Sequence, residues 1–379
     1  MKIAKNLFFI SLVFLVFLGT ACMKVQEITT AEFSKNITIG VLLPLSEKKS
    51  DLGKTLLSTL TLAVQELNKK GGIHNQSITL LINDTKCDPL LAKQEAEELS
   101  KMQVIAIIGG VCDEETDAIA ITAEQKRIVF ITPVSSIDSL TDYEYTFRTV
   151  PANTAESENA AGFAFNVLKI TKAAVIFEDA RTSAEKEKSF VHYFEGIGGT
   201  VISEEIFQKN TTNVQSQIAR IKLSKSPFIY ILSSKNTELA MIADELRKQK
   251  IPATILVGNN ILTETFAEEN VNMTNNFYAI RIAFSKENEQ TKKVLDSYTE
   301  LTHEENRFPF WTATTYDSMQ LLSKAINEVG TKPRDIKNYF YIFEHQKLAA
   351  GTYSIDGNGN AEMQYEMLKV KNGTLRKEK

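Results

Sequence analysis

The feature that most constrains the fold is a regular alternation of short apolar runs with longer amphipathic stretches, which begins at Ile37. The run "ITIGVLL" (37–43) is typical of a buried strand, and the stretch 56–67 places its apolar residues on one helical face before "KKGG" ends it. Repeated units of this kind predict a doubly wound parallel sheet with right-handed crossovers.

The same rhythm runs through most of the chain. After 37–43 and 56–67, the first half is expected to hold strands 78–82, 104–108 and 128–131, a helix opened by Asp88 and Pro89, and a helix at 113–126. From Asn153 we expect helices 155–169, 183–195, 212–223 and 236–249 and strands 173–177, 200–207, 228–232 and 253–257. Helices 287–302, 312–328 and 333–342 and strands 349–355 and 363–370 follow. With 379 residues and 43% apolar content, the chain is predicted to form two α/β lobes that it crosses more than once.

The N-terminus has the pattern of an export signal over residues 1–21. Lys2 and Lys5 precede the apolar run 7–18, which is too short to span a bilayer comfortably, and small residues precede Cys22. The pattern resembles a bacterial lipoprotein signal, although Gly19 stands where leucine is usual. The resemblance implies a lipid on Cys22 that anchors the chain to a membrane outside the cytoplasm, with 22–35 as a tether. The alternative is ordinary cleavage after Ala21, which leaves a free thiol.

Composition argues against several other classes of function. Without residues 1–21, the chain has 41 basic and 47 acidic side chains, a net charge of about −6, and it has no basic cluster that would bind nucleic acid. The histidines make no metal spacing, and "DGNGN" (356–360) lacks the later residues of a calcium loop. No nucleophile or nucleotide motif is present, so we expect no metal, no cofactor and no enzymatic activity. The histidines are His74, His192, His303 and His345.

A series of short strings resembles the type I periplasmic binding proteins, in particular the leucine/isoleucine/valine-binding group of ABC-transporter solute receptors. The strings are "IGVLLPLS" (39–46), "AVQELNKKGGI" (63–73), "NDTKCDP" (83–89), "IIGGVC" (107–112), "FITPVSS" (130–136), "FRTVPAN" (147–153), "TTYDSMQLLSKAI" (314–326) and "YSIDGNGN" (353–360). The resemblance implies two hinged lobes, 36–150 with 282–345 and 151–281 with 346–379. It also implies a small-molecule solute between them and a membrane permease as partner.

The resemblance further implies a disulfide and a set of ligand-binding positions. Cys87 and Cys112 match the bridge of lobe 1. In amino-acid-binding relatives, hydroxyls after the second cysteine and after "ITPxx" hold the ligand carboxylate, and a lobe 2 acid holds its ammonium. Here the first hydroxyl position is Asp113, and the second is Ser136 with Ser135 beside it. The acid position is Asn260, and the aromatic positions are Leu52, Thr182 and Ser234.

Asp113 is the departure with the largest physical effect. It places the protein's own carboxylate at a helix start that would otherwise attract an external anion, and Glu114 and Glu115 add to the first turn. Two like charges about 4 Å apart repel by about 4 kcal/mol at a protein surface, roughly a thousandfold in affinity. The hypothesis is a ligand that is not a plain L-amino acid but a neutral polar or cationic solute, or a peptide. The alternative is that Asp113 only caps its helix, that Glu114 and Glu115 complement the helix dipole, and that Ser135 and Ser136 are capping or turn residues.

Two functions follow from this pattern. The first is a lipid-anchored, extracytoplasmic receptor that binds a solute and presents its closed form to the permease of an ABC transporter. The second is a lipoprotein regulator of a cell-envelope enzyme, which uses the same fold as a protein-docking module. Fold alone does not separate the two.

Overall fold

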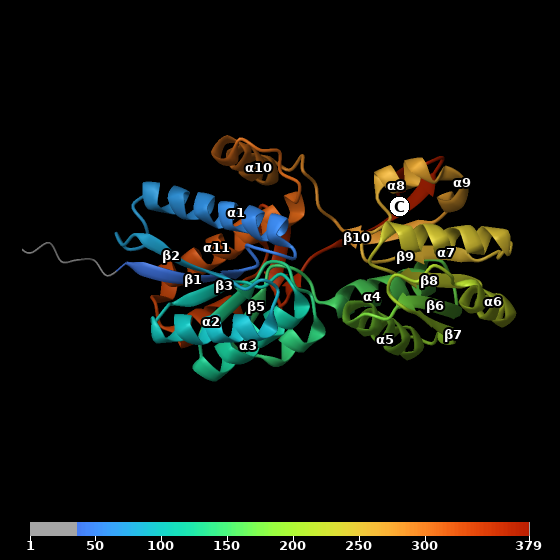
Figure 1. Ribbon diagram of the computed structural model, residues 1–379, viewed down its shortest axis with the longest axis horizontal. Coiled ribbons are helices and arrows are strands. Elements are labelled where there is room, and N and C mark those ends of the chain that lie inside the picture. Colours follow the sequence, from blue (N-terminus) through green and yellow to red (C-terminus); the bar gives the residue numbers. More distant parts are fainter. Residues whose placement is uncertain (1–35, 379) are drawn as a thin grey trace, which may run out of the picture. The chain divides into compact units, whose positions relative to one another are not determined.

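Two large β-sheets, each with helices on both faces, organise the chain (Figure 1). The computed structural model describes residues 36–378, so the predicted signal (1–21), Cys22 and the tether (22–35) lie outside the described residues. The expected α/β class with two sheet-based lobes is confirmed. Within residues 36–378, no helix is both long enough and apolar enough to cross a membrane.

The lobe 1 sheet is parallel throughout and has the strand order β2-β1-β3-β4-β5. Its strands are β1 (Ile37–Leu43), β2 (Ile78–Asp84), β3 (Ala106–Gly109), β4 (Val129–Thr132) and β5 (Thr146–Arg148). The order reverses between β1 and β3, and such a reversal opens a crevice at the carboxyl ends of the strands, where ligands bind in open α/β sheets. The helices of this lobe are α1 (Ser50–Lys69), α2 (Pro89–Lys101), α3 (Asp113–Lys126), α10 (Glu289–Thr302), α11 (Pro309–Val329) and α12 (Pro333–Phe340), with a short 3₁₀ turn η1 (Asp138–Asp142).

The lobe 2 sheet is mixed and has the order β15-β14-β10-β9-β8-β6-β7. Parallel strands β6 (Lys172–Glu178), β7 (Thr200–Phe207), β8 (Phe228–Leu232), β9 (Thr254–Val257) and β10 (Tyr278–Ile282) are extended by antiparallel β14 (Tyr365–Lys371) and β15 (Thr374–Lys377). The helices are α4 (Asn153–Gly162), which continues as a π-turn (Phe163–Val167), α5 (Arg181–Gly196), α6 (Gln215–Ser224), α7 (Asn236–Lys248), α8 (Glu264–Glu269) and α9 (Val271–Thr274). The strand order reverses here between β6 and β8.

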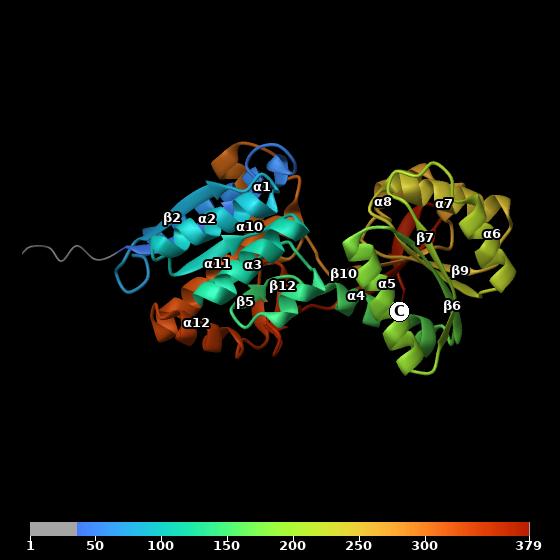
Figure 2. The same cartoon turned by 60° about the horizontal axis from the view of Figure 1, so that its bottom comes forward.

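Strand periodicity explains why both faces of each sheet are covered. In β1, Ile39 and Val41 face a core that includes side chains of α1 and α11, whereas Leu42 faces a second core with α2 and α3. The helix α12 lies beside β5 (Figure 2), where the rings of Phe147 and Phe340 are 4.6 Å apart. Because both faces of the strand are buried, the sequence of β1 is a nearly continuous apolar run and does not alternate with polar residues.

The segment 346–362 departs from the expected lobe boundary. The resemblance predicts that 346–379 belongs to lobe 2, but β11 (Gln346–Leu348), β12 (Gly351–Ile355) and β13 (Ala361–Glu362) form a small sheet whose buried side chains join the lobe 1 core. The buried carboxylate of Asp317 on α11 accepts hydrogen bonds at 2.8 Å from the N–H groups of Ala349 and Ala350. Of residues 346–378, only those from β14 onward belong to the lobe 2 sheet. Within 36–378 the chain therefore passes between the lobes at 149–152, 283–288 and 363–364.

Two glycines end β3 because backbone and side chains approach them closely. A Cβ on Gly109 would lie 1.9 Å from the carbonyl oxygen of Leu42, and Gly110 has φ +78° with Thr116 directly against it. The chain then enters Cys112, which forms the expected disulfide with Cys87 across a sequence separation of 25 residues, with a Cα–Cα distance of 5.5 Å. The disulfide therefore ties the start of α3 to the loop between β2 and α2.

Replacing both Cys87 and Cys112 by serine should lower the free energy of unfolding by about 3 kcal/mol, because the bridge closes a loop of 25 residues in the unfolded chain. Urea denaturation of the two proteins measures this difference. A reducing agent should destabilise the wild-type protein and leave the double variant unchanged. Equal stability of the oxidised wild type and the variant would contradict the prediction.

Asp317 predicts a specific pH dependence. Complete burial raises its pKa to about 7, although two backbone N–H groups and the Tyr353 hydroxyl act in the opposite direction. An unfolded aspartate titrates near pH 4, so between about pH 4 and 7 the folded state binds more protons and loses stability as the pH rises. From pH 5 to pH 8, the wild type should lose about 2–3 kcal/mol relative to Asp317→Asn in urea denaturation.

The matched control is Asp296→Asn, which changes an exposed aspartate on α10. Its stability relative to the wild type should be the same at both pH values. A constant difference between the wild type and Asp317→Asn would show that Asp317 does not titrate in this range.

Candidate functional site

The start of α3 lies at the crevice edge of the lobe 1 sheet, directly after β3. Cys112 is the N-cap residue, and Glu115, whose side chain is fully buried, accepts hydrogen bonds from the N–H groups of Val111 (2.8 Å) and Cys112 (3.0 Å). Glu115 thus satisfies the N–H of the N-cap residue, as in a capping box, and that of the residue before it. The alternative that Asp113 is the N-cap is wrong, because Asp113 is the first helical residue and its carboxylate is bound elsewhere.

The carboxylate of Asp113 is held by hydroxyl groups from both lobes. Its Oδ1 accepts a hydrogen bond from Ser135 Oγ at 2.9 Å, and its Oδ2 accepts one from Thr182 Oγ1, also at 2.9 Å. Burial raises the pKa of Asp113, and the two hydroxyls act in the opposite direction. Three of the predicted site residues therefore meet at one point, with Ser135 following β4 and Thr182 in the first turn of α5.

The other predicted site residues do not join this contact. Ser136 is half-buried and accepts a backbone hydrogen bond from Asn153 through its carbonyl oxygen. Leu52 lies on α1 within the lobe 1 core, as expected of an apolar residue on the inner face of a helix. Ser234 and Asn260 are exposed, at the carboxyl ends of β8 and β9, and the N–H of Ser234 donates to Glu178 at 2.9 Å.

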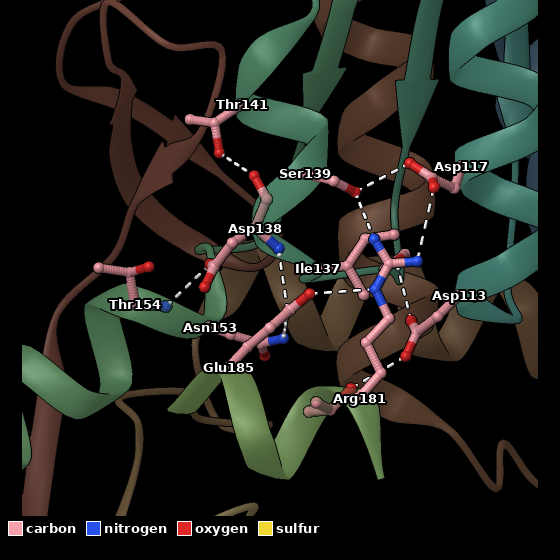
Figure 3. A network of polar contacts seen from close by, with 12 residues as sticks. Asp113, Asp117, Ile137, Asp138, Ser139, Thr141, Asn153, Thr154, Arg181 and Glu185 are labelled. Carbon is pink, nitrogen blue, oxygen red and sulfur yellow. Dashed lines mark hydrogen bonds and ion pairs between the residues drawn. The ribbon is translucent and has the colours of Figure 1, made fainter. Parts of the chain in front are cut away.

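Arg181, which the sequence analysis missed, makes a second contact between the lobes (Figure 3). From the start of α5, its guanidinium donates to Ser139 Oγ at 2.7 Å and lies 3.5 Å from Asp117 on α3. It also pairs with Glu185, one turn along α5, at 3.1 Å. Burial acts to lower the pKa of Arg181, but Glu185 and Asp117 raise it above its ordinary value.

A local conflict in the sequence could have pointed to Arg181. A cation in the first turn of a helix is opposed by the helix dipole, and such conflicts are concentrated at functional sites. Helical spacing places Asp113 and Asp117 on one face of α3, and Arg181 and Glu185 on one face of α5. These two faces are the ones that meet.

Glu185 extends the network to the first chain crossing. Its Oε2 accepts hydrogen bonds from the backbone N–H of Asp138 (3.1 Å) and the side chain of Asn153 (2.9 Å), while Asp138 accepts from the N–H of Thr154 at 3.1 Å (Figure 3). Burial raises the pKa of Asp138. The residues on either side of the crossing at 149–152 are therefore tied to α5.

A buried arginine supports this segment from lobe 1. Arg148 at the end of β5 is 1% exposed and donates to the carbonyl of Ile137 at 2.8 Å. Burial lowers its pKa to about 10, and the charges of Asp138, Asp356 and Glu185 act in the opposite direction. Arg148 thereby positions the turn that carries Asp138 and Ser139.

Two other features of the described residues lie apart from these contacts. A groove of about 690 Å³ between α1, α10 and the loop to α11 is lined by residues that include Lys54, Tyr298 and Arg307, and by none of the predicted site residues. Glu115 lies near the sulfurs of Cys87 and Cys112, but both sulfurs are bonded in the disulfide and offer no thiolate to a metal.

Comparison with known proteins gives consistent results. The periplasmic binding protein family model matches residues 36–374. A Leu/Ile/Val-binding protein from Citrobacter freundii is 19% identical over 343 residues, which cover 88% of this chain and 90% of that protein. A leucine binding protein from Thermotoga maritima has 23% identity and a TM-score of 0.71, covering 90% of this chain and 98% of that one. An ABC-transporter solute binding protein from R. palustris, in complex with benzoate, has 19% identity and a TM-score of 0.67, covering 90% of this chain and 95% of that one.

The two sheets and the three crossings now have a common explanation. The structural matches extend over 90% of the chain at low identity, so what they share is the fold. The family match covers almost all of the described residues, including both lobes and the β14 strand. This chain belongs to the periplasmic binding protein family, and its fold is that of the type I members.

Proposed function

We propose that this chain is an extracytoplasmic solute-binding lipoprotein of an ABC transporter, and that its solute is a small polar molecule that is not a plain L-amino acid. The family supports solute binding, and the names of relatives such as the Leu/Ile/Val-binding protein support a transporter of the branched-chain amino acid type. The signal pattern before Cys22 supports the lipid anchor. The solute would bind between the lobes and favour the arrangement that the permease recognises.

The observation that carries the ligand proposal is the carboxylate of Asp113. It accepts hydrogen bonds from the hydroxyl groups of Ser135 and Thr182. Asp113 stands at the start of α3, where a helix N-terminus would otherwise favour a ligand anion. A ligand carboxylate at this point would meet a like charge and find its donors already used. The R. palustris protein, in complex with benzoate, is a relative whose ligand has no ammonium group, so this fold takes ligands other than amino acids.

One observation favours the alternative of a regulator that docks onto a cell-envelope enzyme. Arg181 joins the lobes through Asp117 and Ser139 by the chain's own side chains, as a fixed docking surface would require. A receptor needs lobes that exchange between arrangements, so the strength of this contact separates the two functions.

Asp113→Ser should bind L-leucine up to about a thousandfold more tightly than the wild type, because it removes about 4 kcal/mol of like-charge repulsion and frees two hydroxyl donors. Isothermal titration calorimetry measures both affinities. Glu114→Ser is the matched control, since it removes an exposed charge from the same helical turn and should leave the affinity unchanged. Micromolar binding of L-leucine by the wild type would refute the ligand proposal.

Arg181→Ala should shift the lobes away from the arrangement in which α3 and α5 are in contact. The partly exposed ion pair between Arg181 and Asp117 joins the two helices and contributes about 0–1 kcal/mol, so its loss should shift the population by no more than about fivefold. Distances between spin labels placed on α2 and α6 report the population. Arg220→Ala, which removes an ion pair with Glu205 inside lobe 2, should not change them. An unchanged distance distribution in Arg181→Ala would show that the contact does not set the arrangement.

A further inference from the structure

A buried pair of opposite charges lies in lobe 2, outside the contacts described above. Lys186 on α5 and Glu156 on α4 have side chains that are 8% and 9% exposed, and Lys186 Nζ lies 2.8 Å from Glu156 Oε2. The same ammonium donates to Asn259 Oδ1 at 2.8 Å. Burying a charge is costly unless it is paired and hydrogen-bonded, so this arrangement requires both partners.

The carboxylate of Glu156 is fully supplied with donors. Its Oε1 accepts hydrogen bonds from the backbone N–H of Asn259 at 3.0 Å and from the hydroxyl of Tyr230 at 3.1 Å, while its Oε2 accepts from Lys186. Gly258 permits this approach, because a Cβ there would lie 2.7 Å from Glu156 Oε1. Groups from α4, β8 and the turn after β9 therefore form a carboxylate site, and the ammonium of Lys186 on α5 binds in it.

The position of this pair links it to the candidate site. Lys186 follows Thr182 by four residues on α5, so the two side chains lie on the same helical face, one turn apart. Asn259 and Asn260 stand at the carboxyl end of β9, and Glu156 follows Asn153 in the first turn of α4. The pair thus lies at the crevice edge of the lobe 2 sheet, one turn behind the contact of Thr182 with Asp113.

We infer that Lys186 is a specificity-determining residue. Its ammonium is paired with the Glu156 carboxylate, so this carboxylate is not available to bind the ammonium group of a ligand. The inference rests on the proposed function and deepens it. Lobe 1 supplies its own anion through Asp113, and lobe 2 supplies its own cation through Lys186. Both charges of an amino-acid head group are therefore provided by the chain, and the solute class that fits is an uncharged, hydrogen-bonding molecule.

The first test asks whether Glu156 is a site for an external ammonium, independently of any solute. Lys186→Ala removes the atoms that propylammonium would replace, so tens of millimolar propylammonium should raise the Tm of this variant by about 2 °C or more. Propanol, which lacks the charge, should not. The matched control is Glu156→Gln combined with Lys186→Ala, which keeps the space and removes the carboxylate, and which should not respond to propylammonium. An equal response of the two variants would overturn the inference.

The second test asks whether Lys186 sets ligand class. Calorimetry should show that L-leucine binds the double variant Asp113→Ser, Lys186→Ala at least about tenfold more tightly than Asp113→Ser alone. Lys186→Gln, which keeps hydrogen-bond donors without the charge, replaces Lys186→Ala if that variant does not fold, and it should show the same direction of change. Equal affinities would overturn the role of Lys186 and leave the proposed function standing. If no variant binds L-leucine, the ligand proposal for Asp113 fails, and the propylammonium test still decides whether Glu156 binds an ammonium.

Discussion

The candidate site depends on the hydrogen bonds of the Asp113 carboxylate, which accepts one from a hydroxyl group of each lobe. Its position is fixed by features that all act on the start of α3. Gly109 and Gly110 let the chain turn out of β3, the disulfide anchors Cys112, and the buried Glu115 accepts hydrogen bonds from the N–H groups of Val111 and Cys112. Because Glu115 fills the capping role, the Asp113 side chain is free to reach across to lobe 2. The helix start is thereby a point of contact between the lobes, and it carries the chain's own carboxylate.

Three charged groups are each bound by other side chains of the same chain, an arrangement that we call internal compensation. Asp113 is bound by hydroxyls, Arg181 lies between Asp117 and Glu185, and Lys186 is paired with Glu156. The partly exposed pairs of Arg181 are individually weak, whereas the pair in lobe 2 is buried and cannot lose one partner without a large penalty. The contacts between the lobes can therefore break at low cost, whereas the buried pair of Lys186 and Glu156 stays formed. Such a combination allows the lobes of a receptor to move while the buried charges stay paired.

The sequence predicted elements whose signals are local. The bounds of β1 and of α3 at 113–126 agree with the structure, and Asp88 caps α2 as its position before Pro89 suggested. The placement of 346–362 was wrong, because an alternating pattern identifies a strand and does not say which core will bury it. That choice is made by Asp317, some 30 residues away, whose carboxylate meets the N–H groups of Ala349 and Ala350. The resemblance placed Asp113, Ser135 and Thr182 among the ligand-binding positions but did not predict the hydrogen bonds between them. The contacts of Arg181 and Lys186 depend on how two lobes and four elements pack.

The strength of the contacts between the lobes also limits the free energy that a solute must contribute to shift the lobe arrangement. A ligand shifts an equilibrium between two arrangements only by the difference in its affinity for them, and a full reversal from 1:99 to 99:1 needs about 5.5 kcal/mol. The partly exposed ion pair between Arg181 and Asp117 supplies about 1 kcal/mol at most toward the arrangement in which α3 and α5 touch, because the pair with Glu185 lies within α5. An uncharged solute that makes about four or five hydrogen bonds to both lobes can supply the remainder, since each contributes about 1 kcal/mol net. Internal compensation thus lowers the demand on ligand binding, and a solute without strong ionic contacts is sufficient to control the arrangement that a permease would recognise.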